Sequence, residues 1–179
     1  MTLRSEQYDD VYFSADDGMA ETHHVFLNGN NLPKAWDDQD HFTVAETGFG
    51  TGLNFLCTWK LFEETAKSHQ KLHFISVEKF PIARDQISNA LMQWQDDLSP
   101  YIKRLSDLYP VRVPGPHHIR FNDQVTLTVW FGDLNDVTPQ WTGKVDAWLL
   151  DGFTPAKNPE MWTETLFENM ARLSHSETT

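Results

Sequence analysis

The sequence lacks the features of disulfide-bonded and membrane-spanning proteins. Its 179 residues include one cysteine, Cys57, so neither an intrachain disulfide nor a cysteine zinc cluster can form. No apolar run is long enough to cross a bilayer, and the first residues are polar and acidic, unlike a signal peptide. These absences predict a soluble, cytoplasmic protein with no membrane partner.

Positive charge is also scarce. Fourteen Lys and Arg residues face 26 Asp and Glu residues, for a net charge of −12, which argues against strong free-standing affinity for nucleic acid. The adjacent pairs His23-His24 and His117-His118 point apart on a strand and have no carboxylate at ligand spacing, so we predict no metal site. With 40% hydrophobic residues, the chain can still bury the core of one domain.

Three of the nine glycines lie within five residues, at Gly48, Gly50 and Gly52. They follow an apolar run that ends on Glu46 and precede a helix-forming stretch, which predicts a strand, a tight turn and a helix N-terminus that cradle a nucleotide-like ligand. Glu46 would repel a pyrophosphate but suits a ligand with an ammonium and a sulfonium, such as S-adenosylmethionine. The alternative is an ordinary glycine turn.

Apolar runs alternate with helical patterns from residue 41 onward. The predicted strands are 42–46, 72–78, 125–131 and 145–150, with 119–121 pairing beside the third, and the predicted helices are 53–67, 81–94, 101–108 and 161–173. This order indicates an α/β fold with a mostly parallel sheet and helices on both faces. Residues 1–40 hold two short apolar pieces, 11–13 and 24–27, and are interpreted as a hairpin or lid extension of the core domain 41–179.

An acidic residue follows or ends each of the four main predicted strands: Glu46, Glu78, Asp133 and Asp151. Ligands of such sheets bind at the carboxyl ends of the strands, so the four acids are expected to lie together. Glu78 is placed to accept both ribose hydroxyls of the ligand, and Asp133, after Gly132, to accept from an adenine amino group. Each acid taken alone is also explained as a loop carboxylate.

The stretch after the last strand, 151–162, combines an acid, a glycine, an aromatic and prolines. Asp151 is interpreted as the acceptor of the proton that an amine nucleophile must lose, and Phe153 as an aromatic face for a base or the sulfonium. A plain turn with a helix starting at Asn158-Pro159 is the alternative. Trp162 is kept as a candidate near the acceptor, and Lys79 and Lys157 as possible phosphate contacts.

Several motifs together resemble the methyltransferase part of the MnmC family, bacterial bifunctional proteins of tRNA 5-methylaminomethyl-2-thiouridine biosynthesis. The matching segments are 9–14, 25–30, 46–55, 77–79, 130–133 and 149–159. The resemblance implies a Rossmann-like class I fold, S-adenosylmethionine as donor with S-adenosylhomocysteine as product, and methylation of the 5-aminomethyl group of a wobble uridine. It adds Phe49, Asn54 and Lys79 to the cofactor-binding residues. By the resemblance, Tyr12, Phe13, Ser14 and Asn30 would line the cofactor or acceptor pocket. Together with Pro155, Lys157 and Trp162 they are the candidates for substrate binding.

Two departures from that family affect the expectations. Nothing in the chain resembles the second domain, which carries FAD, and the strands that complete a seven-stranded sheet are missing after 173. Strand 145–150 would then have an open apolar edge that favours self-association. The tRNA anticodon region is the expected partner, recognised through one extruded nucleotide. The alternatives are an inactive remnant that binds cofactor only and a nucleotide-dependent oxidoreductase, against which Glu46 argues.

Overall fold

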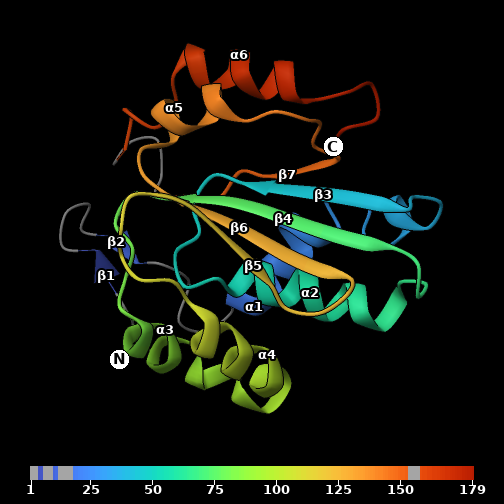
Figure 1. Ribbon diagram of the computed structural model, residues 1–179, viewed down its shortest axis with the longest axis vertical. Helices are drawn as coiled ribbons and strands as arrows, with labels where there is room; N and C mark the ends of the chain where they lie inside the picture. The colour runs from blue at the N-terminus through green and yellow to red at the C-terminus, as the bar shows by residue number, and fades with distance from the viewer. Residues whose placement is uncertain (1–3, 6–9, 12–17, 153–157) are drawn as a thin grey trace.

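The alternating segments build a mixed sheet with helices on both faces, in a computed structural model that describes residues 4–5, 10–11, 18–152 and 158–179 (Figure 1). Within these ranges the sheet has five strands in the order β5-β6-β4-β3-β7. Their bounds are β3 His41–Glu46, β4 Lys71–Glu78, β5 Gly115–Arg120, β6 Val125–Phe131 and β7 Ala147–Leu149. Strands β6, β4, β3 and β7 are parallel, and β5 is antiparallel to β6. The predicted α/β class is confirmed.

The strand register aligns the carboxyl ends of the central strands. Glu46 of β3 lies opposite Ser76 of β4 and Leu149 of β7, and Glu78 lies opposite Phe131 of β6. The acids that end these strands therefore meet at one edge of the sheet. Buried apolar residues alternate with half-buried ones along β6, as the period-2 pattern predicts.

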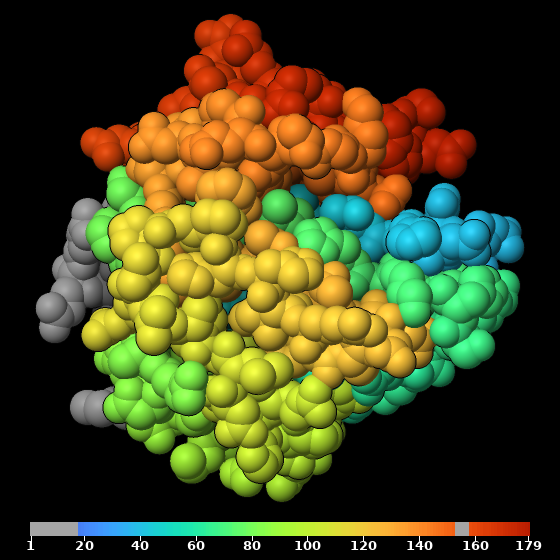
Figure 2. Space-filling model, viewed as in Figure 1, coloured from blue at the N-terminus to red at the C-terminus, as the bar shows by residue number. Residues whose placement is uncertain are grey.

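One face of the sheet is covered by α1 Gly18–Glu21, α2 Leu53–Thr65, α3 Arg84–Leu91 and α4 Gln95–Leu108, and the other by α5 Leu134–Val137 and α6 Glu164–Leu173 (Figure 1). Short helical turns are η1 Thr22–Leu27, η2 Lys34–Trp36, η3 Met92–Trp94 and η4 Thr138–Gln140. A larger core lies under α2 and α4, and a smaller one that includes Trp141 and Trp148 lies under α5 and α6. In the space-filling view the residues around α5 and α6 form a continuous layer along one side of the molecule (Figure 2).

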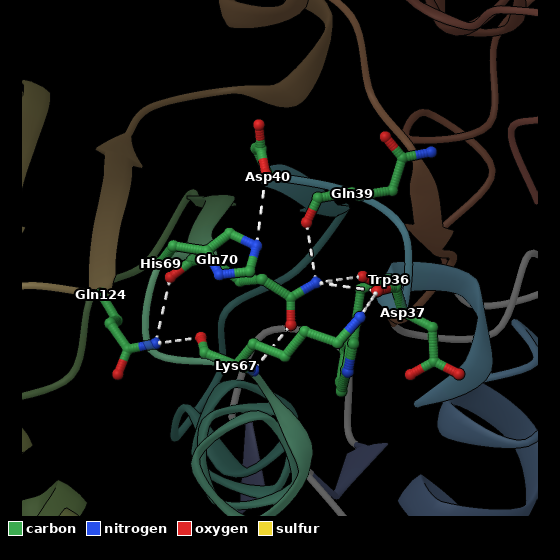
Figure 3. Close-up of polar contacts among 8 residues, drawn as sticks. All are labelled: Trp36, Asp37, Gln39, Asp40, Lys67, His69, Gln70 and Gln124. Carbon is green, nitrogen blue, oxygen red and sulfur yellow. Dashed lines mark hydrogen bonds and ion pairs between the residues drawn. The ribbon is translucent and has the colours of Figure 1, made fainter.

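A buried glutamine joins the loops at the amino-terminal ends of β3 and β4, opposite the acidic edge (Figure 3). Gln70, 2% exposed, donates from Nε2 to the carbonyl oxygens of Trp36 and Gln39 and accepts from the backbone N–H of Lys67. The backbone carbonyl oxygen of Gln70 accepts from the side-chain amide of Gln124. The hydrogen bonds of Gln70 therefore hold this end of the sheet together, beside an ion pair between His69 and Asp40 at 3.4 Å (Figure 3).

The amino-terminal region differs from the predicted hairpin over residues 24–27. These residues belong to η1, a π-helical turn that packs on α2, and Leu27 is 1% exposed in the main core. A two-stranded hairpin does form, but earlier, between β1 Arg4–Ser5 and β2 Asp10–Val11. A short apolar run does not distinguish a strand from a buried helical turn, because both bury the same side chains.

The edge of β7 is not open as predicted. The backbone N–H of Trp148 donates to Thr179 at 2.8 Å, and the N–H of Thr179 donates to Asp146 at 3.1 Å. Val145 pairs with Ser174 in an isolated parallel bridge. The polar tail was predicted to form no strand, but its backbone satisfies this edge, so the premise for self-association through an open edge is corrected.

Candidate active site

The carboxyl end of β3 places Glu46 fully inside the protein, at 0% exposure. Its oxygens accept from the Ser76 hydroxyl at 2.7 Å and from the Asn54 side-chain Nδ2 at 2.9 Å. Burial, followed by the nearby charge of Asp151, raises the pKa of Glu46 to about 8. The described contacts of this carboxyl group are neutral donors, so a cationic ligand would favour its ionised form.

Asp151, directly beyond β7, lies beside Glu46 and shares a donor with it. Nδ2 of Asn54, in the first turn of α2, is 2.6 Å from Asp151 Oδ2, and the Gly152 N–H donates to Oδ1 at 2.8 Å. Burial raises the pKa of Asp151 to about 6 although both hydrogen bonds lower it, and the charge of Glu21 raises it further. A carboxylate with that pKa is a proton acceptor near neutral pH.

The glycine turn between β3 and α2 forms the floor of the site. Gly52 has φ +83° and Gly50 has φ +54°, both in the left-handed region where glycine is favoured. A Cβ at Gly48 would lie 3.2 Å from the backbone oxygen of Asp151, so the two loops approach closely there. The sequence predicted that these glycines let a ligand approach the backbone closely. In the structure, the backbone that approaches Gly48 is that of the Asp151 loop.

Glu78, at the end of β4, holds the turn in place. Its two oxygens accept from the backbone N–H groups of Gly50 and Phe80, each at 2.8 Å. Burial raises the pKa of Glu78 above its ordinary value, against the lowering effect of these hydrogen bonds. The carboxylate therefore links the glycine turn to the end of the neighbouring strand.

Asp133 and Lys79 form an ion pair of 2.7 Å at the end of β6. Asp133 also caps α5 by accepting from the Asn135 N–H at 2.9 Å. Although partial burial acts to raise it, the hydrogen bonds from Lys79 and Asn135 lower the pKa of Asp133 below its ordinary value. The sequence did not predict that Lys79 and Asn135 would be the partners of Asp133.

The carboxylates of this edge share a pattern that matters for ligand binding. In Glu46, Glu78 and Asp133 both oxygens accept from protein donors, which orient the group, and a third partner reaches Glu78 (the Lys79 backbone) and Asp133 (the Asn135 side chain). A carboxylate oxygen has two lone-pair positions, so Glu46 keeps one further acceptor position on each oxygen, whereas Glu78 and Asp133 keep fewer. Groups arranged in this way suit a ligand rich in N–H and O–H donors that carries positive charge.

Other predicted residues are placed differently. Asn30, 6% exposed, donates from Nδ2 to the backbone oxygens of Phe26 and Trp148 and so ties the amino-terminal segment to β7. Trp162 lies 3.9 Å from where a Cβ of Gly152 would be and stacks with Phe167 at 6.4 Å. Tyr12, Phe13, Ser14, Phe153, Pro155 and Lys157 lie outside the described residues.

Two site residues were missed from the sequence. Ser76 lies opposite Glu46 in the parallel register of β3 and β4, a register that the sequence alone does not fix. Thr22 hydrogen-bonds through Oγ1 to Asn54 Oδ1 at 2.7 Å, and no local pattern marks it. Within the described ranges, no group of three or more His, Cys, Asp or Glu could hold a metal ion, and no helix is long and apolar enough to span a membrane.

Comparisons with known proteins were made for the whole chain. A family model described as S-adenosyl-L-methionine-dependent methyltransferase matches residues 96–179. The tRNA 5-methylaminomethyl-2-thiouridine biosynthesis bifunctional protein MnmC of Methylobacillus flagellatus is 49% identical over 178 residues, which are 98% of this chain and 27% of that protein. The chain thus spans about a quarter of the length of this relative.

The fold also matches a solved structure. The crystal structure of MNMC2 from Aquifex aeolicus covers 99% of this chain, and the match takes in 54% of that protein, with a TM-score of 0.72 and 22% identity. At this identity the likeness shows the fold.

Proposed function

We propose that this chain is an S-adenosyl-L-methionine-dependent methyltransferase that methylates a modified tRNA, because a family model of that description matches residues 96–179 and MnmC is 49% identical over 98% of the chain. The proposed reaction moves the methyl group of S-adenosylmethionine to the 5-aminomethyl group of the wobble uridine, giving 5-methylaminomethyl-(2-thio)uridine. The observation that carries this proposal is the pair Glu46 and Asp151, joined by Asn54 beside the glycine turn.

The residues present fit the cofactor. The buried Glu46 carboxyl group would accept from its ammonium, and Glu78 from the ribose hydroxyls, while the backbone N–H groups of Gly50, Lys79 and Phe80 orient the Glu78 carboxylate. Asp133 would accept from the adenine amino group while it is paired with Lys79. When bound, the cofactor supplies an electrophilic methyl group on a sulfonium.

Asp151 would act on the acceptor amine. An alkylammonium has no lone pair to attack carbon, so the amine must lose a proton before transfer, and Asp151 accepts that proton while Gly152 and Asn54 hold its oxygens. Alignment of the amine with the methyl group contributes further by proximity. Phe153, Pro155, Lys157 and Trp162, with Tyr12, Phe13, Ser14 and Asn30, are proposed to line the acceptor side.

The proposed macromolecular partner is the anticodon region of a tRNA, which the printed name of the MnmC relative supports. Flipping one nucleotide into the site would require few phosphate contacts. A cytoplasmic location follows from this substrate as part of the same proposal, and FAD is proposed to belong to the relatives' additional sequence and not to this chain.

The test measures methyl transfer from radiolabelled S-adenosylmethionine to tRNA that carries 5-aminomethyluridine, with the full chain. Asp151→Asn is expected to lower kcat by about 100-fold or more, because a positioned base contributes about 10²–10⁴-fold. Glu78→Ala is expected to weaken S-adenosylhomocysteine binding about tenfold or more in calorimetry, through lost charged hydrogen bonds. The control is Asp136→Asn, an exposed carboxylate of α5.

Each outcome decides between the hypotheses. If the wild-type protein binds S-adenosylhomocysteine but transfers no methyl group, the catalytic proposal is wrong and only cofactor binding remains supported. Preference for a nicotinamide dinucleotide in the same calorimeter would favour an oxidoreductase instead. Normal turnover by Asp151→Asn would remove that residue from the base role.

A further inference from the structure

A chain of side-chain hydrogen bonds runs from the amino-terminal segment into the candidate active site. Thr22, at the start of η1, lies within 2.7 Å of Asn54 Oδ1, and Asn54 Nδ2 reaches Glu46 and Asp151. Thr22 is 2% exposed, Asn54 6% and Glu46 0%. The hydrogen bonds therefore connect the helical layer to the ends of two strands. Within that layer η1 packs on α2, and α2 lies on one face of the sheet (Figure 1).

The chemistry of the four groups dictates the direction of each hydrogen bond. An ionised carboxylate only accepts, and a protonated carboxyl group still accepts through its unprotonated oxygen, so the Asp151 and Glu46 oxygens both face the NH₂ side of the Asn54 amide, which has two hydrogens to donate. The amide oxygen then points at Thr22 and needs a donor. The Thr22 hydroxyl has one hydrogen and two acceptors in reach, Asn54 Oδ1 at 2.7 Å and the Gly18 backbone oxygen at 2.9 Å.

We propose that Thr22 is a positioning residue that fixes the orientation of the Asn54 amide and thereby keeps the Asp151 carboxylate supplied with a hydrogen-bond donor. The inference rests on the proposed function for its effect on catalysis, and on the geometry alone for its effect on the carboxyl groups. In this proposal the Asn54 side chain orients the two acids and makes no direct contact with the cofactor, because both ends of its amide already form hydrogen bonds.

Removing the Thr22 hydroxyl would free the amide to turn its oxygen toward the carboxylates. That orientation replaces a donor by an acceptor next to Glu46 and Asp151, which favours their protonated forms. The charged groups acting on this pair from neighbouring elements are Glu78 at the end of β4 and Glu21 at the end of α1, both of the same sign. The apparent pKa of Asp151 would therefore rise.

The variants are Thr22→Val, which keeps the shape and loses the hydroxyl, and Thr22→Ser, which keeps the hydroxyl. Thr58→Val is the matched control, because the buried Thr58 of α2 donates to the backbone oxygen of Asn54 and not to its side chain. Carboxyl-carbon NMR titration of the full chain follows Asp151 and Glu46 directly, and the pH profile of kcat/KM follows the acid limb of the reaction.

Thr22→Val is expected to raise the apparent pKa of Asp151 by about one unit, the lower end of the effect of one charged hydrogen bond, and to move the acid limb with it. Thr22→Ser and Thr58→Val are expected to titrate as the wild type does. An unchanged titration in Thr22→Val, or the same shift in all three variants, would overturn the proposal.

Two features keep the test decisive. The NMR titration needs no turnover, so a failure of the proposed methyl transfer leaves it readable. If Thr22→Val does not fold, the wild type still decides: the two Asn54 amide protons should be protected from exchange and show couplings across hydrogen bonds to the Glu46 and Asp151 carboxyl carbons. Rapid exchange of both protons would contradict the assigned orientation.

Discussion

At the scale of single residues, the most consequential property of this protein is a carboxyl group, that of Glu46, buried with only neutral donors among its described contacts. Glu46 at 0% exposure has a pKa raised to about 8 from 4.5, chiefly by burial. Such a group costs stability whenever the unfolded chain would ionise it and the folded chain does not. A cationic ligand offsets that cost, so the same residue that weakens the free protein strengthens binding.

Glu46 should make the stability of the free protein depend on pH. Between pH 4.5 and about 8 the folded state keeps a proton that the unfolded chain has released, so the free energy of unfolding falls as pH rises. The full loss is on the order of 5 kcal/mol, at about 1.4 kcal/mol per pH unit. Urea unfolding from pH 5 to 8.5 should show this decline in the wild type and a flatter profile in Glu46→Gln.

Glu64→Gln, on the exposed side of α2, is the control and should decline like the wild type. Equal slopes in Glu46→Gln and the wild type would mean that Glu46 is ionised in the folded protein. Because the variant also loses charge at the proposed ammonium site, its affinity for S-adenosylhomocysteine should fall in the same samples.

At the scale of elements, the turn between β3 and α2 is shaped by backbone conformations that side chains resist. Gly52 has φ +83°, and a Cβ there would lie 2.8 Å from Phe49 Cζ and 2.9 Å from Leu105 Cδ2. The first cost is the left-handed conformation itself, and the second is a collision with the packing of α4. The turn therefore depends on glycine for two separable reasons.

Gly52→Ala and Gly143→Ala separate the two costs. Gly143 also has a left-handed φ, +93°, but nothing lies within 4 Å of its would-be Cβ. Gly143→Ala should lower the free energy of unfolding by about 1–2 kcal/mol, the left-handed penalty. Gly52→Ala should cost about 1–3 kcal/mol more, as overpacking does, with both values measured by urea unfolding. Equal losses would show that Phe49 and Leu105 move aside freely.

At the scale of the whole molecule, the negative net charge disfavours binding of the proposed tRNA substrate, which is itself an anion. The net charge is −12, and Lys79, a cation among the described residues of the carboxyl edge, is paired with Asp133 at 2.7 Å. Affinity for tRNA through phosphate neutralisation is therefore expected to be small, and recognition would rest on the extruded nucleotide.

The salt dependence of tRNA binding tests this balance. Between 50 and 200 mM KCl, a plot of log K against log salt should have a slope of magnitude below about 3, because few phosphates are neutralised. Fluorescence anisotropy with labelled tRNA measures it, and Lys79→Met should change the slope by less than about 1. A slope near −6 or steeper would point to an extended basic surface that the described residues do not provide.

The sequence by itself determined the α/β class, the four main strands and the helix after the glycine turn. These depend on local patterns: a two-residue alternation in 125–131, glycines that permit positive φ, and acids at strand ends that a parallel sheet must gather. It did not determine that 24–27 is helical or that the tail pairs with β7. A short segment follows its tertiary partners where its own pattern fits two structures.

Only the tertiary structure decided how the gathered acids are held. Asn54 and Asp151 are 97 positions apart, and Thr22 and Asn54 are 32 apart, so no spacing in the sequence reveals their hydrogen bonds. The same holds for Lys79 and Asp133, each of which was assigned to a ligand before the structure paired them. The residue types at the strand ends indicate which chemical groups are available. Burial and the hydrogen-bond donors that reach each carboxylate determine its protonation state and its orientation.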